Sequence, residues 1–386
     1  MEKIPFNKPY LTGKETQYIQ DAVNCGKISG NGKYTQMCHR FFEEHYGFGK
    51  CLLTTSCTDA LEMAALLLDI QPGDEVILPS YTFVSTANAF ILRGAKLVFA
   101  DSRPDHPGIE ESQLKALINS RTKAIIVVHY AGVACDMEKV MALANEFGLY
   151  VVEDAAQAID SFYTFSSGKK AALGSIGHLA AFSFHETKNI ISGEGGMLVV
   201  NDPRFVQRAE IIWEKGTNRA AFFRGEVDKY GWIDVGSSFL PSEIVAAFLF
   251  AQLEHLTCIQ EKRKKIWIQY FEGLRSVEGE GIRLPSIPHY ATNNAHMFYM
   301  VAQSGLQRQK IIEALGAKGF HAVFHYLSLH RSPYYAPKHD GRNLPNTDFY
   351  TDCLIRLPLF YELDAISIDR MIPIIRASAQ MGLAAF

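Results

Sequence analysis

The chain has 386 residues, a formal net charge of -3, 48% hydrophobic and 20% charged residues. This composition excludes a disordered chain and lacks the basic excess that nucleic-acid binding requires. No apolar run reaches the ~18 residues of a membrane span, and the N-terminus lacks the apolar core of a signal peptide, so we expect a cytoplasmic protein. The seven cysteines form no Cys-x-x-Cys pair, which predicts free thiols and no metal site.

The N-terminal segment is expected to be an extended arm, because Pro5 and Pro9 interrupt any helix. Helices are predicted at residues 14–23 and 34–46, on either side of a glycine-rich stretch at 26–33. That stretch has neither P-loop spacing nor Gly-x-Gly-x-x-Gly. We therefore interpret it as a plain loop at a subunit boundary rather than as a phosphate cradle.

A first candidate site follows a short strand at residues 51–55. Ser56, Cys57 and Thr58 open a helix whose apolar residues recur at helical spacing. The first N–H groups of a helix lack partners and the helix dipole favours negative charge, so this turn predicts an anion site. Helix capping alone would also explain Ser56 and Thr58.

Apolar strands and helical segments then alternate along the chain. Strands are expected at 75–78, 96–100, 123–128, 150–152, 178–184 and 197–200. Continuous apolar strands with helical crossovers predict an α/β fold, in which helices cover both faces of a mostly parallel sheet. Ligands bind at the carboxyl ends of the strands in such sheets.

Two of these strand ends carry candidate ligand-binding residues. Phe83 follows the strand at 75–78 and can lie flat against a heteroaromatic ring, although a core position is the alternative. Asp154 ends the strand at 150–152, where a carboxylate can keep a pyridine nitrogen protonated. The alternative for Asp154 is a helix N-cap.

The strongest candidate is Lys188, in the sequence Ser183-Phe184-His185-Glu186-Thr187-Lys188. An amine in a partly dry pocket loses proton affinity and can attack a carbonyl, so this lysine is a candidate for Schiff-base formation. The glycines at 193, 195 and 196 allow other backbone or a ligand to approach closely. The alternative is an ordinary surface lysine.

The C-terminal part predicts a second, smaller domain. We place the boundary near residue 250, so that residues 1–250 form a large domain with the N-terminal arm and residues 251–386 a small α+β domain. Its expected elements are helices at 261–274 and 307–318 and strands at 296–302 and 320–326. The proline-containing segment 331–347 predicts a mobile surface loop.

Three motifs together resemble one family. Ser-Phe-His-x-x-Lys at 183–188, Gly-Glu-Gly-Gly at 193–196 and Glu-Asp-Ala-Ala-Gln at 153–157 look like the DegT-type nucleotide-sugar aminotransferases, which use pyridoxal 5'-phosphate (PLP). The resemblance covers nearly the whole chain and implies the aspartate aminotransferase-like fold (fold type I). Further blocks are most similar to the dTDP-4-amino-4,6-dideoxygalactose transaminases; they lie at 214–219, 222–225, 294–299 and 324–326.

The resemblance implies a set of cofactor contacts. Lys188 would form the Schiff base, Asp154 would hold the ring nitrogen protonated, Gln157 would bind the phenolic oxygen and Phe83 would stack on the ring. The phosphate would be held by Ser56, Cys57, Thr58 and Ser183. Ser238 stands where most of the family has an asparagine that reaches the partner subunit's cofactor phosphate, and serine has a shorter reach.

The resemblance also implies substrate contacts at His185, Asn218, Arg219, His325 and Tyr326. Asn218 and Arg219 lie in a polar, aromatic run at 217–232, where a solvated loop is the alternative interpretation.

The implied reaction moves an amino group from glutamate, through PLP and pyridoxamine 5'-phosphate (PMP), to the 4-keto carbon of dTDP-4-dehydro-6-deoxyglucose. The products would be dTDP-4-amino-4,6-dideoxygalactose and 2-oxoglutarate, made by a homodimer with shared active sites. The alternatives are a 3-keto or UDP-linked acceptor and a non-catalytic DegT-like regulator. A related sugar dehydratase has histidine in place of Lys188, and a dehydrogenase would need Gly-x-Gly-x-x-Gly, so both are disfavoured.

Overall fold

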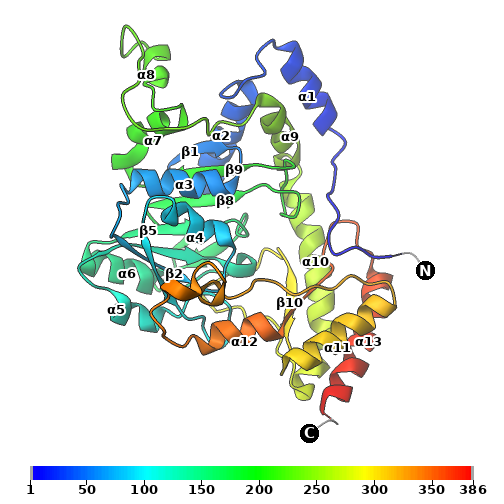
Figure 1. Cartoon of the computed structure of the whole chain (residues 1–386). Coiled ribbons are helices and arrows are strands. Elements are labelled where there is room, and N and C mark those ends of the chain that lie inside the picture. Colours follow the sequence, from blue (N-terminus) through cyan, green and yellow to red (C-terminus); the bar gives the residue numbers. More distant parts are fainter. Residues whose placement is uncertain (1–2, 384–386) are drawn as a thin grey trace.

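The computed structural model describes residues 3–383, which fold around a seven-stranded sheet (Figure 1). The strands lie in the order β1 (Lys50–Thr54), β9 (Gly196–Val200), β8 (Leu179–Ser183), β5 (Tyr150–Asp154), β4 (Thr122–Val128), β2 (Glu75–Pro79) and β3 (Lys96–Ala100). Only β9 runs antiparallel to its neighbours in this sheet. The predicted mostly parallel sheet is therefore confirmed.

Helices cover both faces of the sheet, because alternate residues of each buried strand point to opposite sides. Val151 belongs to the core beneath α2 (Lys33–Tyr46), α6 (Met137–Phe147) and α9 (Glu243–Leu253). Val152 belongs to the core beneath α3 (Cys57–Leu67), α4 (Val84–Ile91) and α7 (Val206–Trp213). This two-sided covering is the predicted α/β architecture.

The C-terminal part has a separate hydrophobic core. It is built from α10 (Leu256–Leu274), β10 (Phe298–Val301), α11 (Gly305–Ala317), α12 (Pro345–Cys353), β11 (Leu354–Leu357) and α13 (Ala365–Leu383), with β10 and β11 antiparallel. Helix α10 contributes Ile259 to the core of the large sheet and Ile266 to the C-terminal core. The division near residue 250 stays a prediction.

Two of the predicted elements are wrong. Residues 320–326 do not form a strand, because their backbone pairs only at isolated bridges, Phe320 with Ile4 and Val323 with Arg356. The segment 331–347 is not a free surface loop, because the buried Tyr335 hydroxyl accepts from Leu97 N–H at 2.7 Å and donates to Leu97 C=O at 3.1 Å. The sequence analysis also missed the hairpin of β6 (Phe162–Thr164) and β7 (Lys170–Ala172).

The N-terminal arm packs along the C-terminal part and leads to α1 (Glu15–Asn24), which lies against α9 (Figure 1). Two short helices, α5 (Leu114–Leu117) and α8 (Arg219–Phe223), complete the α-helices described. No helix within residues 3–383 combines the length and the apolar composition needed to cross a membrane.

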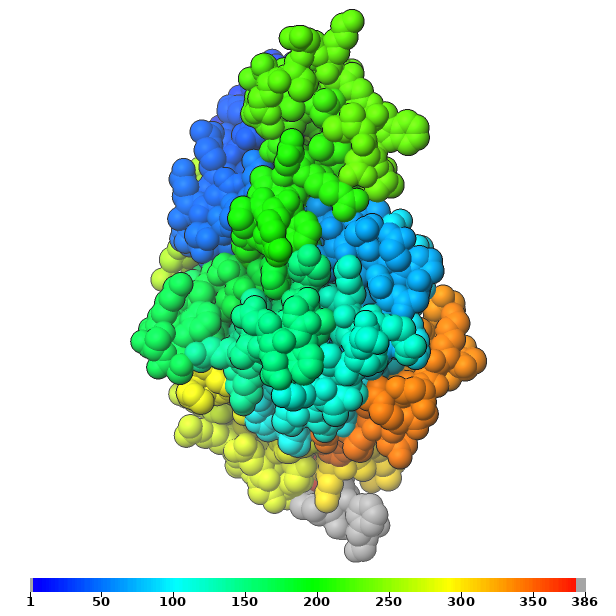
Figure 2. Space-filling model, turned by 90° about the vertical axis from the view of Figure 1, so that its left-hand side faces the viewer, coloured from blue at the N-terminus to red at the C-terminus, as the bar shows by residue number. Residues whose placement is uncertain are grey.

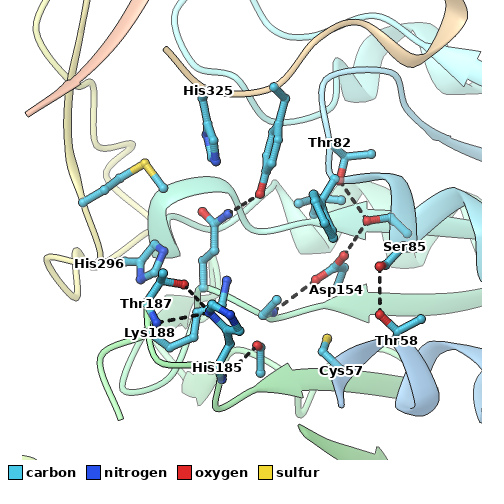
Figure 3. A pocket seen from close by; sticks show the side chains of 18 of the residues that line it. Cys57, Thr58, Thr82, Ser85, Asp154, His185, Thr187, Lys188, His296 and His325 are labelled. Atoms are coloured by element: carbon cyan, nitrogen blue, oxygen red, sulfur yellow. Dashed lines mark hydrogen bonds between the residues drawn. The ribbon is translucent and has the colours of Figure 1, made fainter. Parts of the chain in front are cut away.

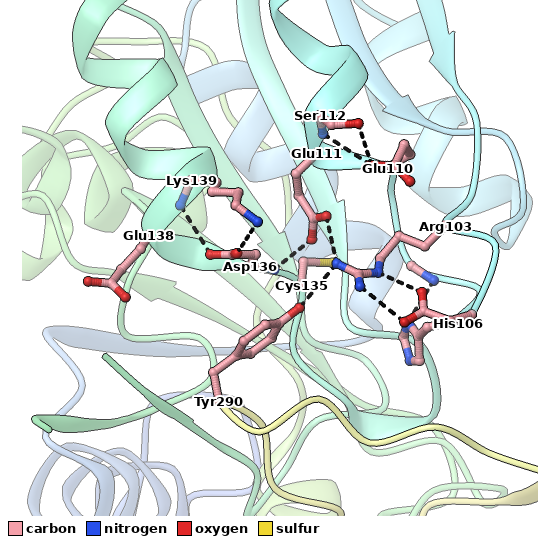
Figure 4. Close-up of polar contacts among 12 residues, drawn as sticks. Arg103, His106, Glu110, Glu111, Ser112, Cys135, Asp136, Glu138, Lys139 and Tyr290 are labelled. Carbon is pink, nitrogen blue, oxygen red and sulfur yellow. Dashed lines mark hydrogen bonds and ion pairs between the residues drawn. The ribbon is translucent and has the colours of Figure 1, made fainter. Parts of the chain in front are cut away.

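A buried polar network fixes the loop after β3 (Figure 4). Arg103 donates to Glu111 at 3.1 Å and to the Tyr290 hydroxyl at 3.4 Å, while the other Glu111 oxygen accepts from Asp136 N–H at 2.7 Å. These groups satisfy one another, so we assign the network a structural role. It fixes the N-terminal end of α6 at Asp136.

Candidate active site

A cavity of about 900 Å³ opens at the carboxyl ends of β2, β5 and β8 (Figure 3). The start of α3 forms one wall, and residues from the C-terminal part, among them His296, His325 and Arg356, form another. This is the position in a parallel sheet where ligands are expected. Its volume lies in the upper range of small-molecule sites.

Asp154 lies at the end of β5 and faces this cavity, although its side chain is only 6% exposed. The Thr86 hydroxyl donates to Asp154 Oδ2 at 2.7 Å, and Ala156 N–H donates to Oδ1 at 3.1 Å. Burial raises the pKa of Asp154 above the ordinary aspartate value, and these two hydrogen bonds only partly oppose the rise. No helix follows Asp154, so the alternative of a helix N-cap is wrong.

The loop between β8 and β9 places Lys188 in the same cavity. Backbone hydrogen bonds from Phe184 to Gly195 and from Glu186 to Gly193 hold the two sides of this loop together. Within residues 3–383, the half-buried Lys188 amine has no hydrogen-bond or salt-bridge partner. Burial lowers the pKa of Lys188, and nearby Cys57 and Asp154 only partly oppose this, so the amine loses its proton more readily than a surface lysine does.

The start of α3 and the end of β8 lie side by side in the wall of the cavity, where we predict an anion cradle. Gly196 pairs with Thr54 on one side and with Ser183 on the other, which brings Ser56, Cys57 and Thr58 beside Ser183. A Cβ atom at Gly196 would lie 2.3 Å from the Ser56 carbonyl carbon. Only glycine therefore permits this approach, which confirms the predicted close packing of backbone at the glycine cluster. Ser56 also caps α3, as the alternative interpretation held, by accepting from Asp59 N–H.

Aromatic and amide side chains line the side of the cavity that faces the C-terminal part. Phe83 is 56% exposed and lines the cavity, so its interpretation as a core residue is wrong. Gln157 accepts from Ala131 N–H at 2.7 Å and donates to the Tyr326 hydroxyl at 2.9 Å. The His325 ring stacks on the Tyr326 ring with centroids 3.5 Å apart, and its Nδ1 lies 2.6 Å from the Tyr130 hydroxyl.

Three of the predicted site residues do not line the cavity of their own chain. Asn218, Arg219 and Ser238 lie in a projecting lobe of residues 214–238. Asn218 accepts from Gly231 N–H on the opposite side of the lobe, and Arg219 approaches Glu214 at 4.0 Å. These three residues therefore do not belong to the site of their own chain. The substrate contacts of Asn218 and Arg219 and the contact of Ser238 with the partner's cofactor phosphate stay predictions. His185 does line the cavity, with Nδ1 2.9 Å from the Thr187 hydroxyl.

The sequence analysis missed several cavity residues. Thr86 is hidden in the first turn of α4, and no spacing rule connects it to Asp154. His296 lies within the family block at 294–299, where its Nδ1 is 2.8 Å from Asn189 Oδ1. Arg356 also lines the cavity. It is the one charged residue in the otherwise apolar strand β11, and this feature of the sequence could have identified it as a site residue.

A mostly parallel seven-stranded sheet with a lysine amine, a buried carboxylate and a helix N-terminus in one cavity is the arrangement expected of a PLP-dependent aminotransferase. The sequence model of the DegT/DnrJ/EryC1/StrS aminotransferase family matches residues 9–376, and the chain belongs to this family. The predicted enzyme class and fold are thereby confirmed.

Solved structures similar to the chain include aminotransferases from several bacteria. The aminotransferase TlmJ from Streptoalloteichus hindustanus is 28% identical with a TM-score of 0.88, and the alignment covers 99% of this chain and 100% of TlmJ. A DegT DnrJ EryC1 StrS aminotransferase from Brucella abortus is 27% identical with a TM-score of 0.85, over 95% of each chain.

The putative sugar aminotransferase Spr1654 from Streptococcus pneumoniae is 24% identical with a TM-score of 0.89, over 99% of each chain, and shows the shared fold. Structures of Spr1654 exist in PLP and PMP forms. PLP cycling through PMP is the cofactor chemistry of the family, as predicted.

Proposed function

We propose that this aminotransferase moves the amino group of glutamate to the 4-keto carbon of dTDP-4-dehydro-6-deoxyglucose, which gives dTDP-4-amino-4,6-dideoxygalactose. The observation that carries the transfer chemistry is the meeting of the unpartnered Lys188 amine, the buried Asp154 carboxylate and the cradle at Ser56 to Thr58 in one cavity. The sugar is proposed from the sequence blocks at 214–219, 222–225, 294–299 and 324–326.

The residues of the cavity fit PLP in size and in chemistry. The N–H groups and hydroxyls at Ser56 to Thr58, with Ser183, would hold the phosphate, because a helix N-terminus favours an anion. Phe83 would contact the face of the ring, and Gln157 would bind its phenolic oxygen. When bound, PLP supplies an electron sink for the bond that breaks at the donor's α carbon.

Lys188 and Asp154 would have separate tasks in the reaction. Lys188 would hold the cofactor aldehyde at rest, and its released amine would then move the proton between the donor's α carbon and the cofactor. Asp154, held in place by Thr86, would accept the hydrogen bond of the ring nitrogen and keep that nitrogen cationic. The cavity of about 900 Å³ leaves room for a sugar beside the cofactor.

The proposed reaction is tested by product analysis with a panel of keto-sugars. The purified protein, loaded with PLP and supplied with glutamate, is incubated separately with dTDP-linked and UDP-linked 4-keto and 3-keto sugars, and the products are identified by mass spectrometry and NMR. We expect an amino sugar from the dTDP-linked 4-keto sugar, with the amine in the galacto configuration. Faster amination of a 3-keto or UDP-linked sugar would contradict the proposed acceptor, and no amination of any sugar would contradict the proposed transfer.

We also propose that the protein is a homodimer in which the projecting lobe of residues 214–238 packs on the partner. The lobe extends from the body of the molecule at the top of Figure 2. It carries exposed apolar side chains, of which Phe223 is 69% and Trp232 85% exposed. Exposed apolar groups gathered in this way are typical of protein contacts.

Light scattering tests the subunit arrangement. We expect the mass of a dimer, and we expect Trp232→Asp to weaken association because a charge replaces an apolar contact. Ser238, at the base of the same lobe, would then lie near the partner's phosphate cradle. A wild-type monomer with full activity would contradict the proposal.

A further inference from the structure

His296 lies in the loop before β10 and lines the cavity on the same side as Lys188 (Figure 3). Its side chain is held on a firmly fixed backbone. The His296 N–H donates to Asn294 Oδ1 at 3.0 Å, and its carbonyl accepts from Arg263 Nη2 at 2.7 Å. The preceding residue, Ala295, has a φ of 53°, a left-handed conformation that is costly for a side chain with a Cβ and that persists only where the surroundings impose it.

The hydrogen bond of His296 to Asn189 fixes which ring nitrogen carries the proton. Asn189 Nδ2 donates to the Asn294 carbonyl at 2.9 Å and to Gln260 Oε1 at 2.8 Å. A backbone carbonyl only accepts, so the atom that faces it is the amide nitrogen and the amide oxygen faces His296. That oxygen lies 2.8 Å from His296 Nδ1 and can only accept, so Nδ1 is the protonated nitrogen.

The other ring nitrogen, Nε2, is therefore an acceptor without a partner. Burial lowers the pKa of His296 well below the ordinary histidine value, so the ring is neutral at pH 7. The nearby cations Lys188, Arg263 and Arg356 lower this pKa further, because they disfavour a second positive charge. Nε2 makes no hydrogen bond to any residue within 3–383. The cavity wall thus contains a neutral acceptor close to the amine of Lys188.

We propose that His296 Nε2 accepts a hydrogen bond from the sugar hydroxyl next to the keto carbon and thereby helps to select the acceptor. The inference rests on the proposed function and deepens it. In a dTDP-linked 4-keto-6-deoxy sugar this hydroxyl is the one at C3, because C5 carries a methyl group instead. Lys188 is close enough to act on the charge of His296, so His296 lies near the carbon at which the amine is installed.

The same nitrogen offers nothing to glutamate. The two carboxylates of glutamate only accept hydrogen bonds, and its amine is the group that is transferred. A neutral acceptor at His296 therefore favours a ligand with a hydroxyl donor and does not favour the amino acid. We accordingly expect His296 to affect one half-reaction and to leave the other nearly unchanged.

The test compares the two half-reactions in the wild type and in His296→Asn, by rapid mixing and absorption. Asparagine places its Nδ2 donor near the position of the histidine Nδ1, so the contact with Asn189 can be kept while the cavity acceptor is lost. We expect the reaction of the PMP-loaded variant with the keto-sugar to slow about 30-fold, and that of the PLP-loaded variant with glutamate to change less than about 3-fold. His289→Asn, which alters an exposed histidine outside the cavity, is the matched control and should follow the wild type in both.

Calorimetry adds a readout without turnover. dTDP-6-deoxygalactose and its 3-deoxy analogue have no keto group, so they bind to the PMP-loaded protein without reacting. We expect the wild type to bind the sugar with the 3-hydroxyl about 10-fold more tightly than the 3-deoxy sugar, and His296→Asn to bind both equally. His296→Gln, whose Oε1 can take the place of Nε2 as an acceptor, should recover part of the preference.

Three results would overturn the assignment. Equal slowing of both half-reactions in His296→Asn would give the residue a structural role, and slowing of the glutamate step alone would assign it to the donor. An unchanged preference for the 3-hydroxyl would remove it from sugar recognition. A wild type that aminates no keto-sugar would instead overturn the proposed function, whereas the comparison of the two unreactive sugars would still test His296, so the two failures are distinguishable.

Discussion

Replacement of Lys188 by alanine is expected to lower turnover by at least about 10⁴-fold. Loss of a general acid–base group alone costs up to about this factor, and here the same amine would also hold the cofactor. The side chain has no hydrogen bond or salt bridge within residues 3–383, so its removal breaks no polar contact there. We therefore expect the variant to fold normally, to bind PLP only noncovalently and to release it during dialysis. Turnover assays and absorption spectra before and after dialysis measure these effects.

The matched control is Lys169→Ala, which removes an exposed lysine from the turn between β6 and β7. This control should retain wild-type turnover and the wild-type spectrum. The account would be contradicted if Lys188→Ala kept a dialysis-resistant chromophore or more than a few per cent of the activity.

Replacement of Asp154 by asparagine is expected to lower turnover by about 10³-fold, as for loss of one strong electrostatic contact in a water-excluded site. The amide preserves the shape of the side chain: its oxygen can accept from Ala156 N–H and its NH2 group can donate to the Thr86 hydroxyl, so the local fold should be maintained. What is lost is the negative charge that keeps the ring nitrogen protonated. Measurement of kcat, with an unchanged thermal unfolding midpoint, checks the effect.

The pH dependence of cofactor binding gives a second readout for Asp154. Because burial raises the pKa of this carboxyl, falling pH neutralises it at a higher pH than an ordinary aspartate. In the cofactor-free wild type, PLP affinity should therefore decrease as pH falls through the raised pKa. Asp154→Asn should bind weakly and lack this decrease, whereas Asp352→Asn, an exposed control, should follow the wild type. A wild-type profile identical to that of Asp154→Asn would contradict the assignment.

The centre of the site could be predicted from the sequence because its residues follow strong local signals. Buried strands read as continuous apolar runs, and the residues after them meet at one edge of the sheet, which predicted the crevice position of Asp154. The glycine cluster predicted a close backbone approach, and Gly196 shows it against Ser56. These inferences need only the local sequence and the geometry of a parallel sheet.

The remaining site residues depend on contacts that the sequence does not encode locally. Thr86 reaches Asp154 across 68 positions of the chain, and Arg356 enters the cavity from a strand of four residues. The stretch 320–326 has strand composition, but its backbone meets partners only at isolated bridges. The lobe of residues 214–238, for which we propose a contact with a partner subunit, illustrates a further limit, because contacts between subunits leave no periodic pattern in one chain.

The most direct measurement of the central claim is borohydride reduction of the PLP-loaded protein followed by peptide mass spectrometry. Reduction fixes a Schiff base as a stable amine and so records which lysine holds the cofactor. We expect the added phosphopyridoxyl mass on the peptide that contains Lys188, and its absence from this peptide in Lys188→Ala. Modification of a different lysine, or no modification of a protein that binds PLP and turns over, would contradict the account.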